Sequence, residues 1–70
     1  MRKLLDVEIV MLAGRSKVRR IAVENFLSSM DGLTEMEAVG NLYQDARLYG
    51  WNGPTVDAIR KGIQLAAGGK

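Results

Sequence analysis

The sequence predicts an all-α fold: a small bundle of three to four short helices in one domain, residues 1–70. Apolar residues recur at three- and four-residue spacing through most of the chain, which is the period of an amphipathic helix. Glycines and capping residues separate these segments, as they do between helices. The chain has no Cys and no His, so neither a disulfide nor a Cys/His zinc site can stabilise so small a core.

Residues 3–13 fit two patterns. Every second residue from Leu5 to Met11 is apolar, which is typical of a strand. Leu5, Ile9 and Leu12 also share one face of a helix. No other segment offers a partner strand, so we expect a helix. A strand that pairs with its own copy across a dimer, as in ribbon-helix-helix repressors, is the alternative.

The next helix is predicted over residues 17–30. Gly14 suits the end of the preceding element, and Ser16 can cap the new helix. The expected apolar face consists of Val18, Ile21, Ala22, Phe26 and Met30, with Leu27 at its edge.

A third helix is predicted over residues 35–49. Thr34 and Glu37 have the spacing of a capping box. Gly40 weakens the helix interior, and a close helix crossing is one reason to expect it there. The expected apolar face consists of Met36, Val39, Tyr43, Ala46 and Tyr49, with Leu42 beside it.

The last helix is predicted over residues 54–66. Gly50 ends the third helix, Asn52 or Gly53 caps the fourth, and Pro54 suits a first turn. The expected core face consists of Val56, Ile59, Ile63 and Ala66.

The composition argues against an enzyme. Without His or Cys, most nucleophile and base arrangements are missing, and no carboxylates have metal-ligand spacing. We therefore expect no catalytic residues, no cofactor and no metal. No segment resembles a secretory signal or a membrane span, so we expect no membrane partner and a location in the cytoplasm of a bacterium or of a phage-infected cell.

Charge is segregated along the chain. Residues 1–23 carry a net +4, residues 24–57 a net −5 and residues 58–70 a net +3. Such asymmetry can mark a partner surface. Because 47% of the residues are hydrophobic in so short a chain, apolar surface should remain after folding, and we expect a homodimer.

Residues 42–63 resemble the helix-turn-helix of bacterial and phage repressors. The resemblance implies a hairpin of helices at 34–50 and 54–66, with the second helix in the major groove of double-stranded DNA. Asp45 departs from the pattern, since that family usually has an apolar residue there. The matching residues are Ala46, Gly50, Trp51, Val56 and Ile59.

The function that this resemblance implies is a small dimeric DNA-binding transcriptional regulator. Side chains near the second helix would read or position the DNA, and bases earlier in the chain would contact phosphates. The first group consists of Asn52, Thr55, Arg60 and Lys61. The second group consists of Arg15, Lys17, Arg19 and Arg20.

The alternative is a helical protein–protein interaction module, such as a phage- or plasmid-type inhibitor or anti-activator of a host protein. The acidic middle of the chain would meet a basic partner. Tyr43, Tyr49 and Trp51 would be its anchors if they are exposed, because interfaces favour aromatic residues. Packing of these three residues in the core is the competing interpretation.

Overall fold

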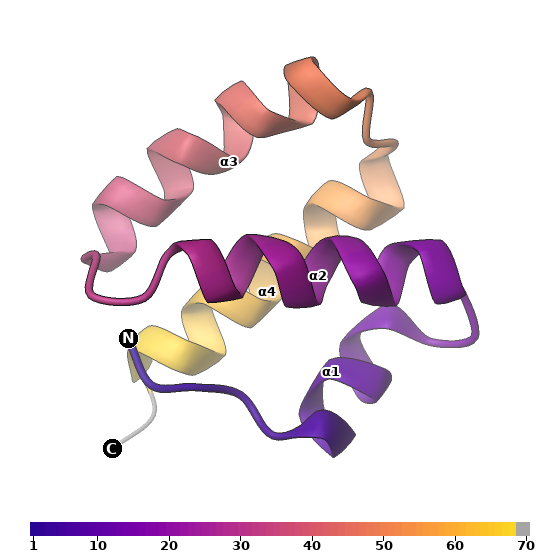
Figure 1. The fold of residues 1–70 in the computed structure, drawn as a ribbon, viewed down its shortest axis with the longest axis horizontal. Helices are drawn as coiled ribbons and strands as arrows, with labels where there is room; N and C mark the ends of the chain where they lie inside the picture. Colours follow the sequence, from indigo (N-terminus) through magenta and orange to yellow (C-terminus); the bar gives the residue numbers. More distant parts are fainter. Residues whose placement is uncertain (69–70) are drawn as a thin grey trace.

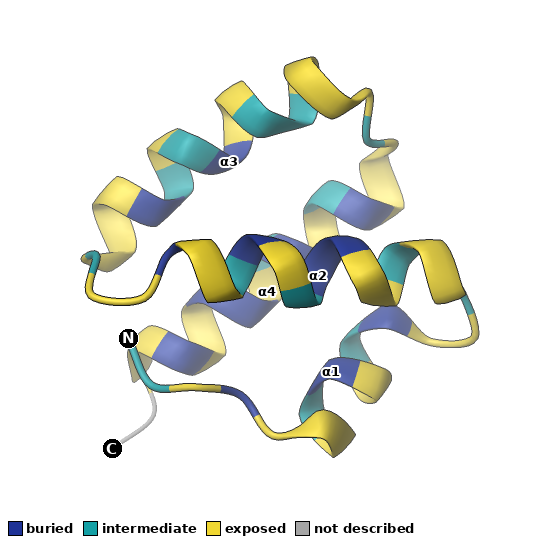
Figure 2. Ribbon diagram, in the orientation of Figure 1, coloured by how far each residue is buried: buried dark blue, intermediate teal, exposed yellow. Residues whose placement is uncertain are grey.

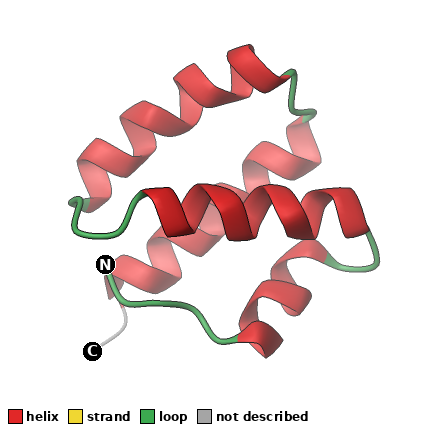
Figure 3. Cartoon of the chain, in the orientation of Figure 1, coloured by secondary structure: helices red, strands yellow, loops and turns green. Residues whose placement is uncertain are grey.

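The computed structural model describes residues 1–68, which form four helices joined by short loops (Figures 1 and 3). They are α1 (Asp6–Ala13), α2 (Lys17–Ser29), α3 (Glu35–Tyr49) and α4 (Gly53–Gly68). The predicted all-α fold is confirmed. The ambiguous N-terminal segment is helical from Asp6 onward, and no strand occurs in residues 1–68.

Local side-chain caps begin α2 and α3 where the sequence predicts them. The Arg19 N–H donates to Ser16 Oγ over 3.1 Å at the start of α2. At the start of α3, the Glu37 N–H donates to Thr34 Oγ1 over 3.2 Å, and the Thr34 N–H donates to Glu37 Oε1 over 3.0 Å. Each bond satisfies a backbone donor that an uncapped helix would leave free.

The hairpin of α3 and α4 also follows its predicted signals. Gly50 ends α3 in the left-handed region, with φ of 69°, where a side chain would be strained. Asn52 then caps α4, because its Oδ1 accepts the Thr55 N–H over 2.9 Å. The two helices are therefore joined by a tight turn at residues 50–52.

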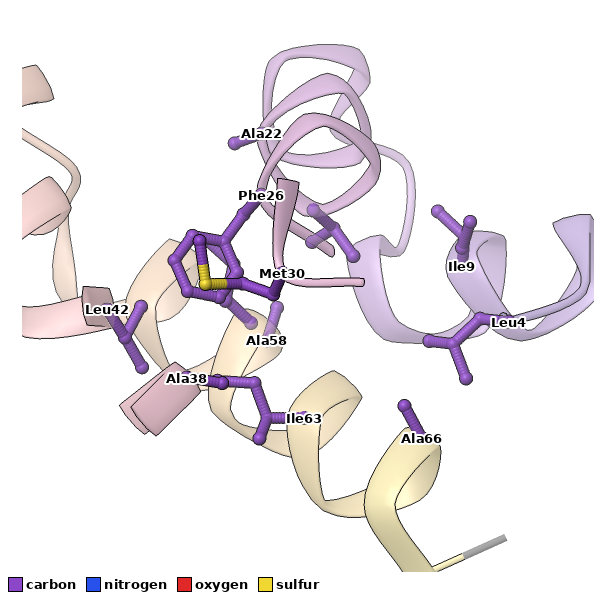
Figure 4. Packing of buried hydrophobic residues seen from close by; sticks show 12 residues of the cluster. Leu4, Ile9, Ala22, Phe26, Met30, Ala38, Leu42, Ala58, Ile63 and Ala66 are labelled. Atoms are coloured by element: carbon purple, nitrogen blue, oxygen red, sulfur yellow. The ribbon is translucent and has the colours of Figure 1, made fainter. Parts of the chain in front are cut away.

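Helix α4 is the centre of the fold. It packs against α1, α2 and α3, while α2 also packs against α1 (Figure 1). The Cα atoms span 28 × 26 × 15 Å, so the helices form a flat arrangement in which α4 crosses behind α2. The largest fully buried side chains of the protein are Leu42, Ile59, Ile63 and Val23. Figure 4 shows Phe26 of α2 and Met30, which directly follows α2, extending toward Leu42 of α3 and Ala58 of α4.

The predicted core face of α2 is partly wrong. Val18 is 78% exposed and Ile21 is 47% exposed, whereas Val23 is fully buried (Figure 2). Ala22 and Phe26 are buried as predicted. Helix α2 has apolar residues on more than one face, so spacing alone does not define which face α1 and α4 cover.

The predicted core face of α3 is partly wrong. Val39 packs against the core as predicted, and Leu42, predicted beside the face, is fully buried together with Ala38. Met36 is 84% exposed, and Tyr43 and Tyr49 are also exposed. Figure 2 shows that much of α3 is exposed.

Gly40 and Gly62 differ in how closely other side chains surround them, which the sequence does not reveal. A Cβ atom on Gly40 would meet nothing within 4 Å, so the predicted close crossing at this residue is wrong. A Cβ atom on Gly62 of α4 would lie 3.1 Å from Leu27 Cδ1 and 3.3 Å from Leu12 Cδ1. The close helix packing therefore occurs at Gly62.

Candidate functional site

The polar residues predicted to read DNA at the start of α4 serve the fold. The Oδ1 atom of Asn52 is engaged in the helix cap. Thr55, predicted to read or position DNA, is buried, so little of it is open to any partner.

The two basic residues predicted on α4 are both engaged with other side chains. Arg60 Nη2 donates to Tyr43 Oη over 2.7 Å, and its guanidinium carbon lies 5.7 Å from the centre of the Tyr43 ring. Lys61 Nζ lies 3.2 Å from Asp57 Oδ2. These contacts are on the surface and contribute little energy, so they reduce the free charge without removing it.

The predicted phosphate contacts gather at the start of α2, but they are not equivalent. Arg19 Nη1 donates to the carbonyl of Ala13 over 3.3 Å, and its Nε is buried with no partner in residues 1–68. This arginine, in the first turn of α2, bonds the last carbonyl of α1, and a cation at the C-terminal end of a helix is favoured by the helix dipole. It is poorly placed for a phosphate.

The remaining basic residues of this cluster face solvent. Arg15 and Lys17 are exposed and form no ion pair within the described part of the chain. Arg20 Nε lies 3.7 Å from Glu24 Oε1, a loose surface pair. Three cations are therefore available near the first turn of α2.

An aromatic cluster closes the turn between α3 and α4. The rings of Tyr49 and Trp51 stack with centroids 5.4 Å apart. Trp51 also meets the edge of Phe26 in α2, with centroids 6.0 Å apart. Trp51 is half-buried, whereas Tyr49 is 64% exposed and Tyr43 is exposed on the outer face of α3. The alternative prediction required all three aromatic residues to be exposed. The structure shows Tyr43 and Tyr49 exposed and Trp51 half-buried against Phe26, so its condition is met only in part.

A groove of about 400 Å³ lies beside this cluster, between α2 and the end of α3. Its walls are mostly apolar, and Asp45 is the single charged residue among them. Sequence reasoning missed Val18 and Ile21, which it assigned to the core. The lining residues are Val18, Ile21, Ala22, Asn25, Phe26, Ser29, Asp45, Tyr49 and Trp51. We call this feature the α2–α3 groove.

A second hollow, of about 430 Å³, lies beside the N-terminal segment and contains charges of both signs. One of its charges, Arg2, is committed to Glu8 through two hydrogen bonds of 2.9 and 2.7 Å. These bonds, with one from the Leu5 N–H, lower the pKa of Glu8 to about 2. The hollow differs from the α2–α3 groove in its lining, which within residues 1–68 has several charged residues of both signs and no aromatic residue.

A further apolar surface lies on the outer side of α1. Val7, Val10 and Met11 recur at helical spacing, and Leu5 precedes them. All four are exposed. We call these four residues the α1 stripe.

Residues 1–68 include no helix that is long and apolar enough to cross a membrane. In the same range, no three metal-ligating side chains of His, Cys, Asp or Glu lie close enough together to hold a metal ion. A scan against protein-family models and searches of curated proteins and of solved structures find no significant match to this chain. The geometry of the α2–α3 groove and of the basic cluster is therefore the basis for the functional argument.

Proposed function

We propose that this chain is a helical protein–protein interaction module that binds its partner through the α2–α3 groove. One observation carries the proposal: large apolar side chains line an open groove and remain exposed after the chain has folded. Contiguous exposed apolar surface on a small protein typically marks an interaction site.

The groove has the composition of a binding hot spot. Tyr49 and Trp51 are rigid aromatic side chains of the kind that dominate interface energies. Val18 and Ile21 form the opposite wall. Full burial of one such aliphatic side chain contributes about 1.5–3 kcal/mol, so covering both could support a specific complex.

The charge of the groove favours a protein over a nucleic acid. Asp45 is its only charged lining residue, and a carboxylate repels phosphate. The cations available for DNA, Arg15, Lys17 and Arg20, lie near the start of α2 and adjoin the α2 wall of the groove, but none of them lines it.

The proposal is tested by capture experiments with two matched variants. Ile21→Asp places a charge in the groove, and Leu65→Asp places the same charge on α4, outside both the groove and the α1 stripe. Ile21 and Leu65 are 47% and 38% exposed, so folding should be affected to a similar degree. We expect a bacterial protein retained by the wild type and by Leu65→Asp to be lost with Ile21→Asp. Retention by all three forms would contradict the proposal.

We also propose a homodimer that forms through the α1 stripe. A second copy can cover the four exposed apolar residues of α1 symmetrically, as two-fold dimers do. We expect the wild type to sediment as a dimer at micromolar concentration and Met11→Lys to sediment as a monomer. Gln64→Lys, on the exposed side of α4, is the control that should remain dimeric. A wild-type monomer would refute the dimer.

A second candidate function is DNA binding, which the exposed cations Arg15, Lys17 and Arg20 favour. Fluorescence anisotropy with a random duplex at about 50 and 200 mM salt tests it, because phosphate contacts weaken over this range. We expect Arg15→Ala/Lys17→Ala to abolish any binding and Arg60→Ala/Lys61→Ala to change it less. No binding at either salt concentration would exclude this function.

A further inference from the structure

We infer that the α2–α3 groove receives a basic amphipathic helix of the partner protein, with a lysine or arginine of that helix beside Asp45. This inference rests on the proposed function and specifies the occupant of the same groove. Three observations support it: the groove has helical walls, it contains a carboxylate that is unpaired within residues 1–68, and the exposed apolar surfaces that a second copy could offer are poorly matched to that carboxylate.

The walls of the groove are shaped for a helix. On α2, the lining residues Val18, Ile21, Asn25 and Ser29 extend along one face of the helix. Eleven residues of helix rise about 16 Å, which matches roughly three turns of a bound helix. Such a helix would present apolar residues at positions i, i+3 or i+4, and i+7. Both walls are helices, so an extended peptide would find no strand edge there to pair with.

The charge of the groove specifies a cation. Asp45 is half-buried among apolar side chains and forms no ion pair with any other residue in 1–68. The helix that carries it, α3, has Arg47 as its only basic residue and also bears Glu35 and Glu37. The other wall, α2, has Lys17 and Arg20 beside Val18 and Ile21, but neither of them is in the groove lining or paired with Asp45. A partner that buried Asp45 without a cation would leave a desolvated charge unpaired, which is unfavourable.

A second copy of this chain is a poorer occupant. Outside the groove, exposed large apolar side chains lie on the α1 stripe, on α3 at Met36, Tyr43 and Leu48, and at Leu65 of α4. Helix α1 contains Asp6 and Glu8 but no basic residue, and α3 has one basic residue against three carboxylates. Docking α1 into the groove would bring carboxylates toward Asp45. The groove is therefore better matched to a basic helix from another protein.

The occupant can be tested with model peptides because Trp51, the only tryptophan of the chain, lies in the groove. One peptide is a helix of Leu, Ala and Lys with apolar residues at i, i+3 and i+7, and the other carries Glu in place of Lys. We expect the Lys peptide to shift Trp51 emission to the blue and saturably, with affinity at least about tenfold higher than the Glu peptide. The net charge of the protein is +2, so attraction to the whole molecule would favour the Glu peptide instead.

Three variants locate the effect. Asp45→Asn should reduce the preference for the Lys peptide to about threefold or less, because the cation then loses its charged partner. Ile21→Ser should abolish the emission shift, whereas Leu65→Ser, on the exposed side of α4 and outside both the groove and the α1 stripe, should retain it. Circular dichroism on each variant verifies that it folds.

Several results would overturn the inference. They are equal affinities for the two peptides, an unchanged preference in Asp45→Asn, or Trp51 emission that changes with protein concentration without peptide. The last result would assign the groove to a second copy. If no peptide binds but capture still depends on Ile21, the inference fails and the proposed function stands. If capture is also insensitive to Ile21→Asp, both fail.

Discussion

Helices α3 and α4 are nearly equal in length, with 15 and 16 residues, yet they contribute to the molecule in opposite ways. Helix α4 buries a continuous face against three other helices. Helix α3 packs closely against α4 and buries only Ala38 and Leu42. The comparison shows that one helix of the hairpin supplies the core, and the other supplies an exposed wall of the groove.

The sharpest test of this difference is the loss of an aliphatic side chain from each helix. Ile59→Ala in α4 removes a fully buried side chain and should lower the free energy of unfolding by about 2–5 kcal/mol. Leu48→Ala in α3 changes an exposed residue and should alter it by no more than about 0.5 kcal/mol. Urea denaturation followed by circular dichroism measures both. Equal losses would mean that α3 is as important to the core as α4.

The glycines of the two helices provide a second test. Gly62→Ala should destabilise the protein by about 1–2 kcal/mol, because the new methyl group would press on the ends of Leu27 and Leu12. Gly40→Ala should stabilise it by about 0.5–1 kcal/mol, because its surroundings are open and alanine favours a helix. Thermal unfolding of the two variants measures the opposite signs. A stabilising Gly62→Ala would show that the leucines move aside.

The start of α3 provides a third test. Thr34→Ala removes the oxygen that accepts the Glu37 N–H and should cost about 1 kcal/mol. The loss should be local, so amide hydrogen exchange should accelerate in α3 and much less in the middle of α4. Uniform acceleration through both helices would show that α3 and α4 open as one unit.

A fourth test measures how stability depends on pH. It concerns the N-terminal segment, which contacts the C-terminal part of α4. The Arg2 N–H donates to the carbonyl of Ala66 in α4 over 3.0 Å, and the Arg2 guanidinium binds Glu8. The pKa of Glu8 is about 2 in the folded protein, against an ordinary value of 4.5. Its carboxylate therefore stabilises the fold above pH about 4.5, and this contribution is lost as the pH falls through about 2.

The expected shift in stability is small, because the pair is partly exposed. Glu8→Gln should unfold at a lower temperature than the wild type at neutral pH, and the difference should shrink below pH 4.5. Glu37→Gln is the comparison at the start of α3, since the backbone and hydroxyl of Thr34 also lower the pKa of Glu37. If Glu8→Gln still unfolds at a lower temperature than the wild type at low pH, by as much as at neutral pH, this role for Glu8 is contradicted.

The helix boundaries could be predicted because their signals are local. Ser16, Thr34 with Glu37, Gly50 and Asn52 each act within a few residues of themselves, and all four signals appear in the structure. The core face of α4 was predictable for the same reason, since its apolar residues lie on one side.

The faces of α2 and α3 could not be predicted, because each helix has apolar residues on more than one side. Val18 and Val23 have the same chemistry, and only the positions of α1 and α4 decide which is buried. The same holds for Gly40 and Gly62, whose surroundings come from distant parts of the chain. In the candidate site, Tyr49 and Trp51 could be proposed from their residue type. The wall formed by Val18 and Ile21 could not, because it depended on the rotation of α2.

The crowding around Gly62 has a consequence for how the chain folds as it is made. The leucines that meet there are Leu4, Leu12 and Leu27, which precede α4 in the sequence. Their packing around Gly62 is therefore incomplete until α4 has left the ribosome. At about 5–20 residues per second, the interval between Leu12 and Gly62 is roughly 3–10 s. Throughout that interval the apolar faces of α1 and α2 have no α4 to cover them. A chaperone that binds apolar segments would therefore find its target in the nascent chain before synthesis reaches residue 62.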